Sequence, residues 1–115
     1  MPSASSGWKA IFSSAARAGR YDKLILPGVG AFGLAMERLN ECGFPDAIRE
    51  CVLVKRIPFL GICLGMQLML ESSCEKGMYT GLGLIGGEVK FLGDRIKGLT
   101  VPHVGWNEVT FKSTA

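Results

Sequence analysis

The sequence predicts an α/β fold built on a mostly parallel sheet in three layers. Apolar residues make up 48% of the 115 residues and charged residues only 20%, a balance typical of a parallel sheet that helices cover on both faces. The expected elements follow the order strand, helix, helix, strand, helix, which favours parallel strands joined by right-handed crossovers. The length fits one domain.

The first predicted strand covers residues 21–27 and ends at Pro27. The loop Gly28-Val29-Gly30-Ala31-Phe32-Gly33 follows it. Residues 34–41 then have the composition of a helix, and Gly43 is a typical residue to end it.

A second helix is predicted over residues 47–55, with Ile48 and Val52 on one face. Phe44-Pro45-Asp46 is a break before it, in which Asp46 is a candidate N-cap.

The next pair of elements meets at Cys63. Residues 57–62 form a short unbroken apolar run, as expected of a strand buried on both faces. A helix is predicted to follow and to end near Gly77. Gly61 and Gly65 flank Cys63 in the pattern Gly-x-Cys-x-Gly, typical of a strand-to-helix elbow that presents a nucleophile. A side chain at either flank would collide with the strand or the helix, and a helix N-terminus favours a thiolate.

From Gly81 onward, glycines interrupt short apolar pieces, which predicts turns and a small antiparallel part. Residues 99–109 have the composition of a strand interrupted by Pro102.

Composition excludes several classes of function. A net charge of +3 is too small to indicate a nucleic-acid or membrane-surface partner, and no apolar run approaches the roughly 20 residues of a membrane span. The single His and the absence of a Cys-x-x-Cys pair argue against a metal site, and no secretory signal supports a disulfide framework. We therefore expect a cytoplasmic protein without a metal or other cofactor. Its cysteines are Cys42, Cys51, Cys63 and Cys74.

Residues 1–20 form an atypical N-terminal segment, and the domain is expected over residues 21–115. The segment has no acidic residue and has several serines, with Trp8, Ile11 and Phe12 at helical spacing. It could be an organelle transit segment or, as we favour, an ordinary amphipathic segment or a replaced gene start.

The loop Gly28–Gly33 matches Gly-x-Gly-x-x-Gly between a strand and a helix, which taken alone indicates a dinucleotide site. Such a site expects an acid at the end of the next strand, where this sequence has Gly61-Ile62-Cys63. We favour a loop whose backbone N–H groups point at a developing oxyanion, in the same crevice as Cys63.

A thiol nucleophile needs a general base. The only His is His103, and Gly105 stands where an orienting acid would follow. We do not expect His103 to be the base. Gln67 lies one helical turn beyond Cys63 and could hydrogen-bond a polar substrate, or simply lie on the surface.

Three ordered motifs resemble the class I (triad-type) glutamine amidotransferases, and within them most resemble the glutaminase subunits of imidazole glycerol phosphate synthase. The resemblance runs from about residue 21 to the end. The motifs are Leu26-Pro27-Gly28-Val29-Gly30-Ala31-Phe32, Gly61-Ile62-Cys63-Leu64-Gly65-Met66-Gln67 and Pro102-His103-Val104-Gly105-Trp106-Asn107.

The resemblance implies a flavodoxin-like fold and a glutaminase that supplies ammonia to a (β/α)8-barrel cyclase in histidine biosynthesis. Carried over by position, Cys63 is the nucleophile and Trp106 faces the cyclase. The remaining implied roles are an oxyanion hole at Gly28, Val29, Gly30 and Leu64, and glutamine binding by Gln67 and Glu75.

The sequence also departs from the family. Residues 1–20 show neither the family's opening strand nor its Gly-rich turn, and the segment that supplies the family's catalytic His and Glu has no counterpart. We therefore expect a partial domain that is inactive alone. The alternatives are a non-catalytic remnant that binds a partner through Trp106, and a different cysteine hydrolase that uses His103.

Overall fold

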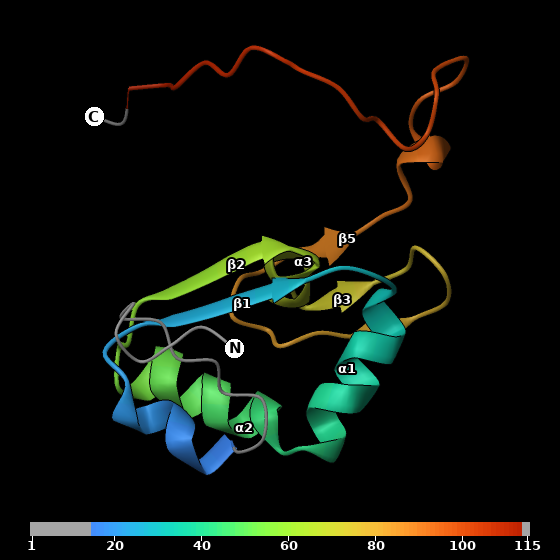
Figure 1. Ribbon diagram of the computed structural model, residues 1–115. Coiled ribbons are helices and arrows are strands. Elements are labelled where there is room, and N and C mark those ends of the chain that lie inside the picture. Colours follow the sequence, from blue (N-terminus) through green and yellow to red (C-terminus); the bar gives the residue numbers. More distant parts are fainter. Residues whose placement is uncertain (1–14, 114–115) are drawn as a thin grey trace.

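A computed structural model describes residues 15–113 and places two parallel strands at the centre of the molecule (Figure 1). Strand β1 (Leu24–Gly28) pairs with β2 (Phe59–Cys63) in a register that runs from Leu24 opposite Phe59 to Gly28 opposite Cys63. Helices α1 (Phe32–Glu41) and α2 (Phe44–Arg49) form the connection between them. The predicted parallel pairing across a helical crossover is confirmed.

The turn between the two helices differs from the prediction. Gly43 has φ 70°, a left-handed conformation that glycine adopts without strain, and α2 begins directly after it at Phe44. Asp46 is therefore not the N-cap. It lies in the first turn of α2, where a carboxylate is favourable beside the N-terminal end of the helix dipole. Helix α2 continues as the π-helical η3 (Glu50–Val54).

Helix α3 (Leu64–Leu68) is much shorter than predicted. The carbonyls of residues 68–70, which would accept helical hydrogen bonds from residues further along, instead accept from the loop at residues 82–84. The amides of Leu82 and Leu84 donate to the carbonyls of Leu68 and Met69, both at 2.8 Å. This pairing with a distant segment ends the helix well before Gly77.

A second, small sheet follows α3. Strand β3 (Ser72–Ser73) lies between β4 (Tyr79–Thr80), which is antiparallel to it, and β5 (Glu88–Val89), which is parallel. The small sheet is therefore mixed, and it begins before Gly81.

The hydrophobic core lies on one face of the β1–β2 pair. Side chains of alternate strand residues point to opposite faces, and Leu26 and Phe59 pack against the core while Ile25, Leu60 and Ile62 are 40%, 54% and 48% exposed. The prediction that the strand at residues 57–62 is buried on both faces is therefore wrong for the described part of the chain. The buried core residues are Phe32, Met36, Ile48, Leu64, Leu68 and Leu82.

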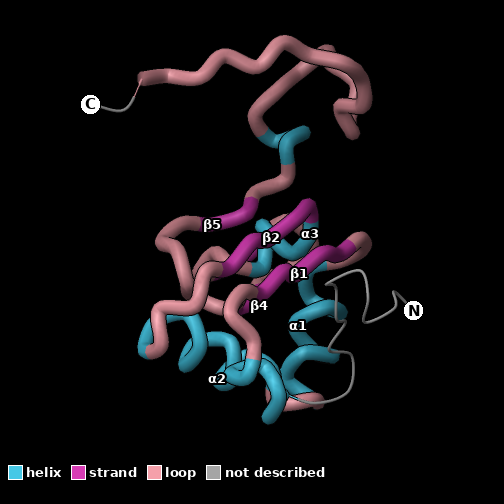
Figure 2. The backbone as a smooth tube through the Cα atoms, turned by 60° about the vertical axis from the view of Figure 1, so that its left-hand side comes forward, coloured by secondary structure: helices cyan, strands magenta, loops and turns pink. Residues whose placement is uncertain are grey.

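Two segments flank this body. The 3-10 turn η2 (Ala15–Arg20) packs against α2 and buries Ala18, and the rest of the amphipathic segment predicted at residues 1–20 lies outside the described residues. After η4 (Leu92–Asp94), residues 95–113 lie away from the body in both views, where the chain first makes a loop beside η4 and then runs on extended (Figure 1, Figure 2). The strand predicted at residues 99–109 is absent from this described segment, because Pro102 interrupts it and no neighbouring strand pairs with it.

Within residues 15–113, no helix has the length and apolar character that crossing a membrane would require.

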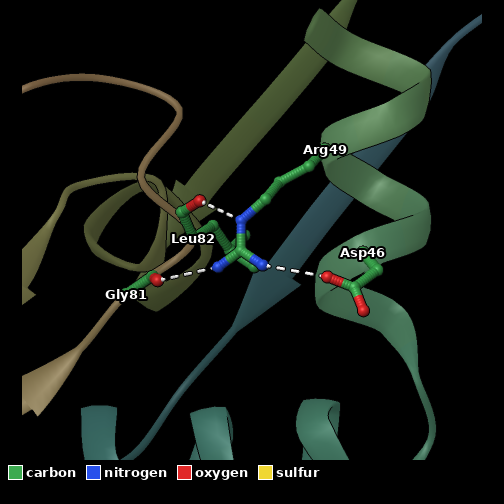
Figure 3. Close-up of polar contacts among 4 residues, drawn as sticks. All are labelled: Asp46, Arg49, Gly81 and Leu82. Atoms are coloured by element: carbon green, nitrogen blue, oxygen red, sulfur yellow. Dashed lines mark hydrogen bonds and ion pairs between the residues drawn. The ribbon is translucent and has the colours of Figure 1, made fainter. Parts of the chain in front are cut away.

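Arg49 on α2 contacts the loop at residues 81–84, whose amides pair with the end of α3 (Figure 3). Its Nε donates to the carbonyl of Leu82 at 2.8 Å, and Nη2 donates to the carbonyl of Gly81 at 3.4 Å. Its Nη1 also forms an ion pair with Asp46 at 3.3 Å, but the side chain of Asp46 is 97% exposed. Because Leu82 is fully buried, the guanidinium holds a core residue in place through that residue's backbone.

Replacing Arg49 with alanine is expected to lower the free energy of unfolding by about 1 kcal/mol, because two carbonyls lose a charged donor. The matched variant Asp46→Ala is expected to cost much less, because an exposed ion pair contributes little. Urea unfolding curves of both variants measure the difference. Equal losses would show that the surface ion pair, and not the carbonyl contacts, stabilises this corner.

Candidate active site

Cys63 is the junction between β2 and α3, and its backbone is strained. It has φ 55° and ψ −117°, a combination that costs a non-glycine residue about 1–3 kcal/mol and that persists only where the surrounding structure imposes it. Strain of this kind is concentrated at functional sites. The thiol is exposed. The elbow predicted from the sequence is therefore present.

The two flanking glycines are required by close backbone contacts. A Cβ atom at Gly65 would collide with the carbonyl oxygen of Leu26 in β1, and a Cβ at Gly61 would lie 2.7 Å from the backbone N and Cα of Met66 in α3. The strands and the short helix can approach this closely only without side chains at these positions. The steric argument made from the sequence is confirmed.

The glycine-rich loop lies beside this elbow. Gly28 is opposite Cys63 in the strand register, and a Cβ at Gly28 would lie 3.3 Å from the Cβ of Leu64 and 3.6 Å from the amide nitrogen of Gly65. Val29 is 88% exposed, and Gly30 has φ 115°, which favours glycine. Gly28 thus lies beside Cys63 and the buried Leu64 at the carboxyl ends of the two strands, and Val29 and Gly30 continue the loop from there.

A groove of about 1200 Å³ begins at this loop. Gly30, Ala31 and the length of α1 from Phe32 to Glu41 form one part of its lining, and Ser73, Glu75, Lys76, Tyr79 and Thr80 form the other. Glu75 is half-buried, and its amide donates to the hydroxyl of Ser73 at 3.3 Å. The structure therefore brings Gly30 and Glu75 to one groove, whereas Cys63 and Gln67 are not among its lining residues. Gln67 is half-buried on α3.

His103 and Trp106 lie on the extended segment that leaves the body. The side-chain Nδ2 of Asn107 contacts Nε2 of His103, and Trp106 is completely exposed. The structure does not bring either residue to Cys63.

The four thiols differ in their surroundings. Cys51 is buried, Cys42 is exposed, and Cys74 is half-buried with its Sγ 3.7 Å from the carbonyl of Val89. The neighbouring carboxylate of Glu88 raises the pKa of the Cys74 thiol, and partial desolvation adds to this effect. Cys74 is therefore less nucleophilic at neutral pH than an ordinary exposed cysteine.

Ser73 and Tyr79 are groove residues that the sequence reasoning missed. Ser73 is 1% exposed and holds the backbone of Glu75, and Tyr79 lies against the start of α1. Neither belongs to a recognisable motif, so only their proximity to Glu75 in the sequence could have drawn attention to them.

Among residues 15–113, no group of three or more His, Cys, Asp and Glu side chains is placed to hold a metal ion.

These features define an α/β protein with a cysteine at a strained strand-to-helix elbow. The sequence model of the class-I glutamine amidotransferases matches residues 8–112. The chain therefore belongs to the class I glutamine amidotransferase family.

Curated relatives sharpen this comparison. The chain is 57% identical over 89 residues to an imidazole glycerol phosphate synthase subunit HisH of Campylobacter jejuni, covering 76% of this chain and 43% of the relative. It is 57% identical over 95 residues to HisH of Sulfurimonas denitrificans (80% and 45%) and 49% identical over 107 residues to HisH of Chlorobaculum tepidum (91% and 51%). The chain spans about half the length of these relatives.

The strain at Cys63 can be measured with two substitutions. Cys63→Gly is expected to stabilise the chain by about 1–2 kcal/mol relative to Cys63→Ala, because glycine adopts a positive φ freely whereas alanine keeps the Cβ that causes the strain. Thermal or urea unfolding of the two variants gives the difference. If alanine and glycine gave equal stability, the backbone at residue 63 would not be strained.

Proposed function

We propose that this chain provides the nucleophile and the oxyanion side of a glutaminase site. The observation that carries the proposal is the strained elbow at Cys63, which lies opposite Gly28 in the strand register of a class I glutamine amidotransferase. In this reaction the Cys63 thiolate attacks the side-chain carboxamide carbon of glutamine, and the tetrahedral intermediate loses ammonia to leave a glutamyl thioester. Water then hydrolyses the thioester to glutamate.

Backbone donors of the elbow would stabilise the oxyanion of this intermediate. The N–H of Leu64 is the first amide of α3, Gly28 lies beside Leu64, and the backbone N–H groups of Val29 and Gly30 would complete the set. Donors that are already aimed at the developing charge stabilise the transition state without reorganisation.

Gln67 and Glu75 would hold the amino-acid part of the substrate. Glu75 supports this role because it lines the same groove as Gly30, so a glutamine whose carboxamide lies at the loop can extend toward the Glu75 carboxylate. Gln67 lies on α3, one turn beyond Cys63.

We further propose that ammonia passes to a (β/α)8-barrel cyclase partner that binds the Trp106 segment, in a cytoplasmic histidine-pathway complex that needs no cofactor. Support comes from the relatives, which are named as subunits of imidazole glycerol phosphate synthase, and from the full exposure of Trp106. The division of the chain after residue 20 also stays a prediction.

The alternative in which His103 is the base finds no support in the geometry, because His103 lies on the segment that leaves the body. A non-catalytic role in partner binding remains the second candidate, and the exposed Trp106 is the observation that favours it.

A glutamine analogue that carries an electrophile in place of the γ-carboxamide group is expected to label Cys63 selectively, and L-glutamine, but not D-glutamine, is expected to slow the labelling. Peptide mass spectrometry identifies the labelled residue. Cys63→Ala should abolish labelling, whereas Cys42→Ser, which removes the other exposed thiol, should leave it unchanged. The same chain should release little ammonia from glutamine, because its only imidazole is remote from the elbow.

Labelling of Cys42 at the same rate, or labelling of Cys63 that glutamine does not slow, would reject a glutamine site. Steady ammonia release that depends on Cys63 would instead show that the chain already contains a competent base.

Trp106→Ala is expected to weaken binding to a histidine-pathway cyclase at least tenfold, because exposed aromatic residues often contribute most to a protein interface. Phe111→Ala is the matched control, since Phe111 is also exposed, at 89%, on the same segment. Titration calorimetry with the purified cyclase measures both affinities. Equal effects of the two substitutions would argue for a nonspecific apolar contact.

A further inference from the structure

We propose that Tyr79 is a positioning residue that fixes the distance between the Gly28–Gly30 loop and Glu75 across the groove. The inference rests on the proposed function, because the loop and Glu75 are the two sides that a bound glutamine would span. It assigns a role to Tyr79 and to Gly33, neither of which the proposed reaction uses directly.

The ring of Tyr79 lies directly on the backbone of Gly33, the second residue of α1. A Cβ atom at Gly33 would lie 2.5 Å from Cε1 and Cζ of the ring and 2.7 Å from Cε2, distances too short for two carbon atoms in contact. The ring can keep this position only if residue 33 has no side chain, because a methyl group there would displace the ring of Tyr79, which is 44% exposed. Gly33 lies three residues after Gly30, so a ring held against Gly33 also limits movement of the loop.

The strand that carries Tyr79 is connected to Glu75. Tyr79 in β4 pairs with Ser73 in β3, and the buried Ser73 accepts a hydrogen bond from the amide of Glu75 at 3.3 Å. One strand pair thus presents the ring to α1 and holds the backbone of Glu75. Gly30, Glu75 and Tyr79 all line the same groove.

The contact uses the carbon atoms of the ring, so the hydroxyl group is dispensable for it. An aromatic ring suits this role because it is rigid and offers a flat face with only two rotatable bonds. Tyr79→Phe should therefore preserve the function, whereas Tyr79→Ala removes the ring, and Tyr79→Leu keeps apolar volume without a flat face. The matched control is Tyr21→Ala, which removes the other tyrosine of the chain, a half-buried residue just before β1.

Labelling of Cys63 by the electrophilic glutamine analogue separates positioning from chemistry. Tyr79→Ala and Tyr79→Leu should weaken analogue binding (KI) about tenfold, because small displacements of positioning groups have large effects. The rate at which iodoacetamide, which does not use the groove, alkylates Cys63 should stay within twofold. Tyr79→Phe and Tyr21→Ala should behave as the parent chain.

A double-mutant cycle tests the contact itself. Gly33→Ala should weaken analogue binding in the parent chain, because the new methyl group displaces the ring. In the Tyr79→Ala chain the same substitution should add no further loss, because the ring is absent and alanine favours a helix over glycine. Purely additive effects would overturn the proposal.

Amide hydrogen exchange of Ala35, whose N–H donates to the carbonyl of Ala31 at 3.1 Å where the loop enters α1, provides a readout that does not depend on the substrate. Exchange there should be faster in Tyr79→Ala and Tyr79→Leu than in Tyr79→Phe, and unchanged exchange would overturn the proposal. If the parent chain is not labelled in a glutamine-protected manner, the proposed function fails. The exchange result then decides alone whether Tyr79 holds the loop.

Discussion

The contact between the backbone of β1 and the start of α3 places the other parts of the site. The carbonyl of Leu26 occupies the space that a side chain at Gly65 would need, and a Cβ at Gly61 on β2 would lie only 2.7 Å from the backbone of Met66. The chain must therefore turn from strand to helix within one residue, and Cys63 takes a strained conformation as a result. The thiol is presented at the carboxyl ends of both strands, where the ligands of open α/β sheets bind.

Local sterics explain why the elbow, the parallel pair and the helical crossover could be predicted from the sequence. Flanking glycines and an apolar run are sufficient to indicate a tight strand-to-helix turn. The length of α3 could not be predicted in this way, because the amides of Leu82 and Leu84, distant in the sequence, take the carbonyls that would have continued it. The contacts of Arg49 with Gly81 and Leu82 could not be predicted either, because these residues are also distant in the sequence.

In the candidate site, too, some features follow from the local sequence and others depend on contacts between distant residues. Gly28 lies beside Cys63, whereas the groove shared by Gly30 and Glu75 is not lined by Cys63, although the sequence predicts one crevice for the loop and Cys63. In the sequence Gly33 completes a dinucleotide-type motif, whereas in the structure it leaves room for the ring of Tyr79. Packing between an aromatic residue and a distant glycine leaves no trace in spacing or composition, so this part of the site required coordinates.

The parallel register has a consequence for when the thiol acquires its special geometry. Gly28 pairs with Cys63 across the whole connection formed by α1, α2 and η3, since parallel strands need a long connection. Contacts between residues so distant in sequence form slowly. A nascent or unfolded chain therefore carries Cys63 as an unconstrained thiol, and the elbow arises from the assembled crossover. Cys63 therefore acquires its strained backbone conformation only when the two strands and their connection have assembled.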